Sequence, residues 1–222
     1  MLQPATIKFL QQLKKNNSKE WFDKNRPAFE AAKKDFAAFV GTLIDAHGKT
    51  DPEIAALESK DCVFRINRDV RFSKDKSPYK TNMGASINRG GKKSIFAGYY
   101  FHLEPGGSFA GGGIWMPDPN DLKKIRQEID YNYEEFKQIT GSKKFKASFG
   151  TLDESEEYKL SRPPKGYDEK NAAIEFLKLK SFVAMIKIGD EDLTTKALQK
   201  KATDAFAAIQ PLIYFINKAI EA

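Results

Sequence analysis

Residues 83–115 read MGASINRGGKKSIFAGYYFHLEPGGSFAGGGIW, and this stretch decides the fold. It contains three runs rich in β-branched and aromatic residues, at 83–87, 95–103 and 108–115. The turn between the second and third runs reads EPGG, which suits type II geometry because Pro presets φ and Gly accepts a positive φ. Strands joined by such short turns pair antiparallel, so the sequence predicts a meander around residues 62–116.

The spacing of apolar residues on both sides of this region is helical. Residues 4–46 carry apolar side chains at intervals of three and four, with a break before Ser18, whose hydroxyl can cap the next helix. Asp118 opens a further helix. The tail from Thr194 is amphipathic and helical, and we expect it to be kinked or interrupted at Pro211, which lacks an amide hydrogen.

Strands grouped in the middle of the chain with helices on both sides favour the α+β class. The chain shows no linker-like segment, so we expect a single domain over residues 1–222. Residues 1–60 form its helical N-terminal part and residues 61–116 its basic sheet core. Residues 117–222 add helices and one further strand near 181–188. Hydrophobic residues make up 41% of the chain, enough for a sizeable core.

Positive charge is concentrated in residues 61–100. They hold nine Lys and Arg against three Asp and Glu, and so carry six of the seven net positive charges of the chain. Such a concentration indicates an anionic partner. If residues 63–73 are extended, the side chains of Arg65, Asp69 and Arg71 share one face. Guanidinium groups bind phosphate or carboxylate oxygens in pairs, so this face suits a defined anion site.

The predicted anion site is made of six basic side chains: Arg65, Arg68, Arg71, Lys74, Lys76 and Lys80. Two other interpretations stay open. Lysines on an exposed strand edge discourage aggregation without binding any ligand. Asp69 and Asp75 could instead neutralise the arginines internally.

Three consecutive glycines, Gly111, Gly112 and Gly113, interrupt the last of the three central runs. Glycine weakens a strand, so its presence indicates that another group approaches the backbone closely. A bound ligand and a packed helix both meet this condition. We expect these glycines to form a floor under the anion. The pair Gly90-Gly91 is interpreted as a hairpin turn, because the spacing of a phosphate-binding loop is absent.

Tyr100, His102 and Glu104 share a face if their strand is regular. A carboxylate that orients an imidazole makes an acid–base pair, so His102, Glu104 and the separate Asp69 are the candidate catalytic residues. A purely structural His102 is the competing interpretation. The chain has two histidines and one cysteine, Cys62, so we predict no metal site and no cofactor.

A single cysteine excludes an internal disulfide and is typical of a reducing compartment. Lysines interrupt every apolar run in residues 1–20, so no signal peptide is expected there. No apolar run approaches the roughly 18 residues that span a bilayer. We therefore expect a soluble cytoplasmic protein that does not enter a membrane.

Several motifs resemble the uncharacterised family catalogued as domain of unknown function 2461. The most specific is FRINRDVRFSKDKSPYK at residues 64–80, and others lie at residues 98–100, 104–108, 111–115 and 162–167. The family pattern often has Thr at Ser77 and His at Asn82, and the Asn further weakens any metal interpretation. The family carries no assigned activity, so the resemblance implies kinship without a mechanism.

From these residues we expect the Arg/Lys-rich segment to bind a small phosphate or carboxylate anion. The protein could then be an enzyme that acts on a small anionic metabolite. A nucleic-acid or acidic-protein binding module is the first alternative, and it would bind in a strongly salt-dependent way. In the second alternative the arginines are purely structural.

Overall fold

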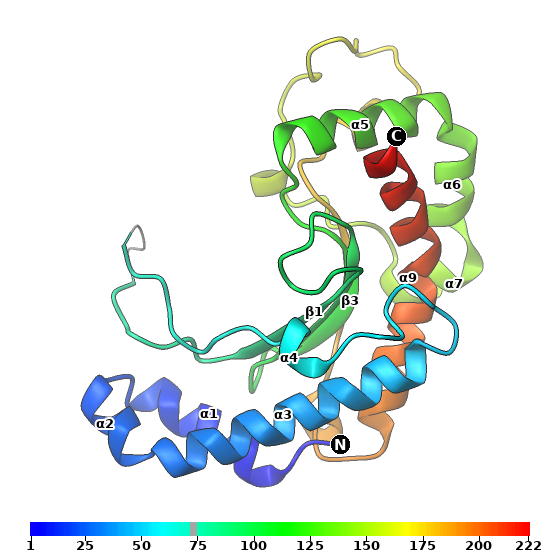
Figure 1. Cartoon of the computed structure of the whole chain (residues 1–222). Helices are drawn as coiled ribbons and strands as arrows, with labels where there is room; N and C mark the ends of the chain where they lie inside the picture. The colour runs from blue at the N-terminus through cyan, green and yellow to red at the C-terminus, as the bar shows by residue number, and fades with distance from the viewer. Residues whose placement is uncertain (72–74) are drawn as a thin grey trace. The chain divides into compact units, whose positions relative to one another are not determined.

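The computed structural model describes residues 1–71 and 75–222, and its fold is α+β as predicted (Figure 1). Four strands form an antiparallel sheet in the order β1-β2-β3-β4. They are β1 (Met83–Ile87), β2 (Gly98–Leu103), β3 (Phe109–Ile114) and β4 (Phe182–Lys187). Each coincides with a predicted run to within three residues at either end. The first three strands follow one another in the sheet, which confirms the predicted meander.

The chain divides into two compact units. The first comprises Met1–Lys93, Tyr100–Ala110 and Lys187–Asp204. The second comprises Ser94–Tyr99, Gly111–Ile186 and Ala205–Ala222. The residues of the basic segment and of the Tyr100–Glu104 stretch all belong to the first unit, which therefore carries the candidate site.

Four N-terminal helices belong to the first unit: α1 (Pro4–Lys15), α2 (Lys19–Lys24), α3 (Arg26–His47) and α4 (Ser59–Cys62). The hydroxyl of Ser18 accepts a hydrogen bond from the Trp21 amide at 3.2 Å, which confirms the predicted cap of α2. The ring of Phe39 on α3 meets Phe101 on β2 edge-on, with 5.0 Å between centroids. Helix α3 is thereby anchored to the sheet through aromatic packing.

The connection between α1 and α2 also holds the base of the basic segment. The side-chain amide of Asn17 donates to the Tyr79 carbonyl at 2.9 Å, and its oxygen accepts from the Tyr79 amide at 3.2 Å. The Tyr79 ring stacks on Phe22 with centroids 3.9 Å apart. Tyr79 is therefore fixed by two hydrogen bonds and a ring contact, so the residues that follow it have a defined position.

The second unit contains four more helices and a short 3₁₀ turn: α5 (Pro119–Tyr131), α6 (Tyr133–Gly141), α7 (Lys143–Phe149), η1 (Glu156–Tyr158) and α8 (Ile174–Leu177). Asp118 caps α5 as predicted, because its carboxylate accepts from the amides of Asn120 at 2.8 Å and Asp121 at 3.2 Å. Another 3₁₀ turn, η2 (Asp190–Asp192), belongs to the first unit.

Helix α9 (Ala197–Glu221) contributes residues to both units. It continues through Pro211, so the interruption allowed for in the sequence is absent. Ile209, Leu212 and Ile213 around the proline are almost fully buried. Burial of these side chains offsets the hydrogen bond that Pro211 cannot make.

The three glycines of β3 lie against other parts of the protein. A Cβ at Gly111 would overlap the Ala184 carbonyl oxygen of β4, and a Cβ at Gly112 would come within 3.2 Å of the Ile209 side chain on α9. Neighbouring strand backbone and a packed helix therefore make the close approach at these positions. These glycines belong to the second unit, and the floor under an anion that the sequence predicts stays a prediction.

Candidate functional site

The basic segment, residues 63–71 and 75–82 as described, is an open hairpin (cyan to teal in Figure 1). Isolated antiparallel bridges join Val63 to Ala85 and Asn67 to Tyr79, and the Lys80 amide donates to the Ile66 carbonyl at 2.8 Å. Within residues 63–71 these isolated bridges and hydrogen bonds do not build a continuous ladder, so the extended strand considered over residues 63–73 is not formed there. Residues 72 and 73 lie outside the described residues.

Two acidic side chains pair with arginines of this segment. Arg71 donates to the Asp69 carboxylate through Nε at 2.9 Å and Nη2 at 2.6 Å, and these hydrogen bonds lower the pKa of Asp69. Arg68 lies 3.1 Å from Asp75, whose pKa is lowered by hydrogen bonds from Ser77 and then by the charge of Arg68. Among the residues that the structure describes, no hydrogen bond joins Asp69 to His102.

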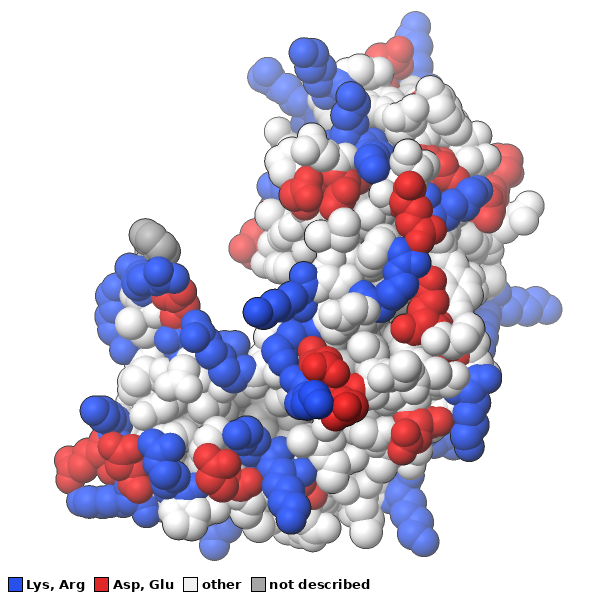
Figure 2. Space-filling model, in the orientation of Figure 1, with Lys and Arg blue, Asp and Glu red and all other residues white. Residues whose placement is uncertain are grey.

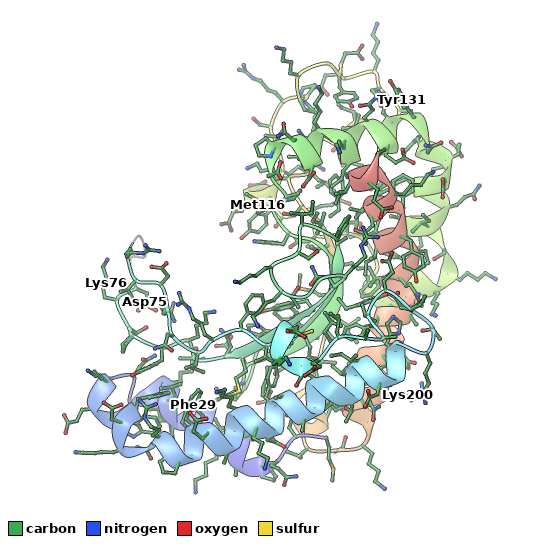
Figure 3. All side chains as sticks on the ribbon, viewed as in Figure 1. Phe29, Asp75, Lys76, Met116, Tyr131 and Lys200 are labelled. Carbon is green, nitrogen blue, oxygen red and sulfur yellow. The ribbon has the colours of Figure 1, made fainter. Side chains whose placement is uncertain are left out.

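The other predicted anion ligands lie in different parts of the segment, and one of them is outside the described residues. Lys76 lies near the end of the segment, beside Asp75 (Figure 3), and its ammonium donates to the Val70 carbonyl at 2.9 Å. Lys74 falls outside the described residues. Arg65, Arg68 and Lys80 form a cationic cluster at the base of the segment, and blue side chains crowd this region in Figure 2.

The cationic cluster is only partly neutralised by nearby carboxylates. Partial burial lowers the pKa of Lys80, and the positive charges of Arg65 and Arg68 lower it further. The Nε of Arg68 is buried and has no hydrogen-bond partner among the residues described. Three cations therefore converge, with Asp75 paired to Arg68 and the charge of Arg65 acting on Asp69, and an added anion would stabilise the remaining positive charge.

A row of hydrogen-bonding groups follows β2 as its two-residue spacing predicts. The Tyr100 hydroxyl lies 3.4 Å from His102 Nδ1, and His102 Nε2 lies 3.3 Å from Glu104 Oε2. The other carboxylate oxygen of Glu104 accepts from the Thr81 hydroxyl at 3.3 Å and lies 3.7 Å from the Lys14 ammonium. Side chains from three segments of the first unit, α1, the basic segment and β2, thus contact one carboxylate.

This row has a preferred direction for its protons. Glu104 can only accept while it is ionised, so Nε2 of His102 carries the proton and Nδ1 accepts from the Tyr100 hydroxyl. Burial raises the pKa of Tyr100 and keeps the phenol neutral. The arrangement resembles a general-base unit in which a carboxylate orients an imidazole and the imidazole polarises a hydroxyl.

Reasoning from the sequence did not find the residues of other segments that contact this row. Thr81, Lys14 and Phe109 contact Glu104 or His102, and the Phe109 ring stacks on the imidazole with centroids 4.5 Å apart. Their spacing along the chain carries no signal for these contacts. Phe109 alone carried a weak signal in the sequence. An aromatic residue beside small residues on a strand indicates a specific packing contact.

The titration of His102 can be predicted from its surroundings. Burial lowers its pKa below the ordinary value of 6.5, and Glu104 partly opposes this. The His102 imidazole therefore binds a proton more readily in the unfolded chain than in the folded protein. The stabilising effect of neutral His102 is complete above pH 6.5 and is lost as the pH falls towards the lower native pKa.

Glu104→Gln should lower the pKa of His102 further in an NMR titration, while Glu20→Gln, an exposed control, leaves it unchanged. A wild-type pKa above 6.5 would contradict this account.

Two other chemistries suggested by residue type find no support in the described chain. Burial, with the charge of Asp61 as a smaller cause, raises the pKa of Cys62 to about 11, so its thiol is not an activated nucleophile. No three His, Cys, Asp or Glu side chains in residues 1–71 and 75–222 are grouped so that they could hold a metal ion.

The helices within those ranges are all too short or too polar to cross a bilayer.

The comparison with known families agrees with the motifs. A sequence model described as "Conserved hypothetical protein (DUF2461)" matches residues 5–215 of the 222. The chain belongs to the DUF2461 family. Searches of curated proteins and of solved structures gave no match. The DUF2461 match extends over almost the whole chain, including the basic segment and β2, so the resemblance carried by residues 64–80 is confirmed.

Proposed function

We propose that this protein binds a small phosphate or carboxylate anion at the cationic cluster of Arg65, Arg68 and Lys80. The observation that carries the proposal is the convergence of three cations around a partly buried ammonium. Lysine ordinarily keeps its charge in water, and like charges beside it add an electrostatic cost. A bound anion would offset that cost.

The Tyr100–His102–Glu104 row supports an enzymatic form of this proposal. A neutral imidazole held between a carboxylate and a hydroxyl can remove or return a proton near neutral pH. In this form the cluster orients an anionic substrate, and the row supplies the acid–base group. Asp69 is left out of the catalytic set because its carboxylate is engaged by Arg71.

The test is thermal denaturation with inorganic phosphate, sulfate and simple carboxylates. An anion at about one hundred times its dissociation constant stabilises the protein by about 2.7 kcal/mol. We expect this stabilisation in the wild type and its loss in Lys80→Met. The control is Lys93→Met, which removes an exposed lysine of the same unit. Equal stabilisation of both variants, or none of the wild type by any anion, would reject the proposal.

A further inference from the structure

Four rings lead away from the cationic cluster in an aromatic row. The Lys80 ammonium lies 5.6 Å from the centroid of the Phe64 ring, and the Phe64 centroid lies 6.4 Å from that of Tyr100. Tyr100 lies 5.7 Å from Phe109, which stacks on His102 with ring planes 8° apart. The four rings belong to the first unit, so their spacing is that of one compact body.

This aromatic row lies on the face of β2 opposite the most deeply buried side chains. Side chains alternate along β2, and Tyr99, Phe101 and Leu103 on its opposite face are at most 1% exposed. The row faces the other way: Phe64 is 36% exposed, and Tyr100 is only partly buried. Aromatic surface that remains accessible beside a cluster of charges is typical of small-ligand sites, where apolar contacts supply area and few polar groups fix the orientation.

We infer that the ligand is an aromatic anion, whose ring lies on Phe64 and Tyr100 while its phosphate or carboxylate binds Arg65, Arg68 and Lys80. The inference rests on the anion-binding function proposed above and adds the chemical class of the ligand. Aromatic rings stack favourably on Phe and Tyr, and the adjacent cations favour a ring that carries negative charge.

The charges around the row favour a small molecule over a nucleic-acid chain. Asp69 and Asp75 pair with Arg71 and Arg68, which leaves a short cluster in place of a long basic stripe. Glu104 lies at the far end of the row, 3.3 Å from His102. A polyanion that continued along the rings would bring its phosphates towards this carboxylate, whereas a single anion at the near end would not.

The test compares methyl phosphate, phenyl phosphate and adenosine monophosphate by calorimetry. Stacking on aromatic side chains predicts that the two aromatic phosphates bind about tenfold more tightly than methyl phosphate. Phe64→Leu should reduce this ratio to about one, because the ring on which the ligand stacks is removed. Phe29→Leu is the matched control, because Phe29 on α3 also lies under a lysine, with Lys33 5.9 Å from its ring (Figure 3). It should keep the tenfold ratio.

The outcomes separate the two proposals. Equal binding of methyl and phenyl phosphate would overturn the aromatic inference and leave the anion site intact. Failure of every phosphate to bind would overturn both. An eight-nucleotide single strand that binds far more tightly than the monophosphate, with a steep dependence on salt, would show a nucleic-acid surface and overturn the small-molecule inference. A tenfold ratio that Phe64→Leu abolishes and Phe29→Leu preserves would establish it.

Discussion

Gly111→Ala is expected to lower the free energy of unfolding by about 3 kcal/mol, through overpacking against the neighbouring strand. The added methyl would overlap the Ala184 carbonyl oxygen and come within 2.7 Å of the Met185 Cα. Backbone atoms cannot rotate away as a side chain can, so β3 and β4 must separate or Gly111 must shift. For a chain of this length the change corresponds to a fall of roughly 6–12 °C in melting temperature.

Gly41→Ala is the matched control and should act in the opposite direction. Gly41 lies inside α3, and a Cβ there would have no neighbour within 4 Å. Alanine is the better helix former, by about 1 kcal/mol, so this variant should melt at a higher temperature than the wild type. Urea unfolding of both variants measures the two effects. A Gly111→Ala protein as stable as the wild type would show that β4 does not approach β3 as described.

The glycines illustrate what local sequence can and cannot predict. Three adjacent glycines on a strand indicate a close approach, but the atoms that approach Gly111 belong to Ala184 and Met185, far along the chain. Nothing near Gly111 specifies which strand becomes its neighbour. The pattern therefore predicted the existence of a contact, while the tertiary structure determined its partner.

Features that depend on contacts within a few residues were predicted correctly. Ser18 and Asp118 cap helices by bonding amides two or three residues further on. Residues 104–107 make the expected type II turn, with Gly106 at φ 83° and the Gly107 amide donating to the Glu104 carbonyl at 2.8 Å. The spacing of Tyr100, His102 and Glu104 along one strand likewise requires only regular β geometry.

The basic segment shows where such reasoning fails. Alternating apolar and charged residues predict a strand, but they do not reveal whether a partner strand pairs along its whole length. Here the described pairing consists of isolated bridges at Val63 and Asn67 with a few backbone hydrogen bonds beside them. Asp69 still pairs with Arg71, and the charge of Arg65 also acts on it. Which arginines are neutralised depends on turns of the hairpin that the alternation does not encode.

Arg68→Gln is expected to weaken phosphate binding by about 10- to 100-fold. A hydrogen bond to a charged group contributes about 1.5–3 kcal/mol, and each 1.4 kcal/mol changes affinity tenfold. The same variant should raise the pKa of Lys80, because Arg68 is one of the cations that lower it. Titration of phosphate by calorimetry measures the first effect, and NMR titration of the Lys80 side chain measures the second.

Asp75→Asn separates an anion site from an internal ion pair. The carboxylate lies 3.1 Å from Arg68, with 55% of the Asp75 side chain exposed, so the pair contributes little to stability. If the cluster binds anions, removing this competing charge should strengthen phosphate binding by several-fold, opposite in sign to Arg68→Gln. If the arginine is purely structural, both variants should lower the melting temperature alike and leave phosphate binding unchanged. Opposite signs in affinity require that Arg68 faces a bound anion, because only then do Asp75 and the ligand compete for one guanidinium.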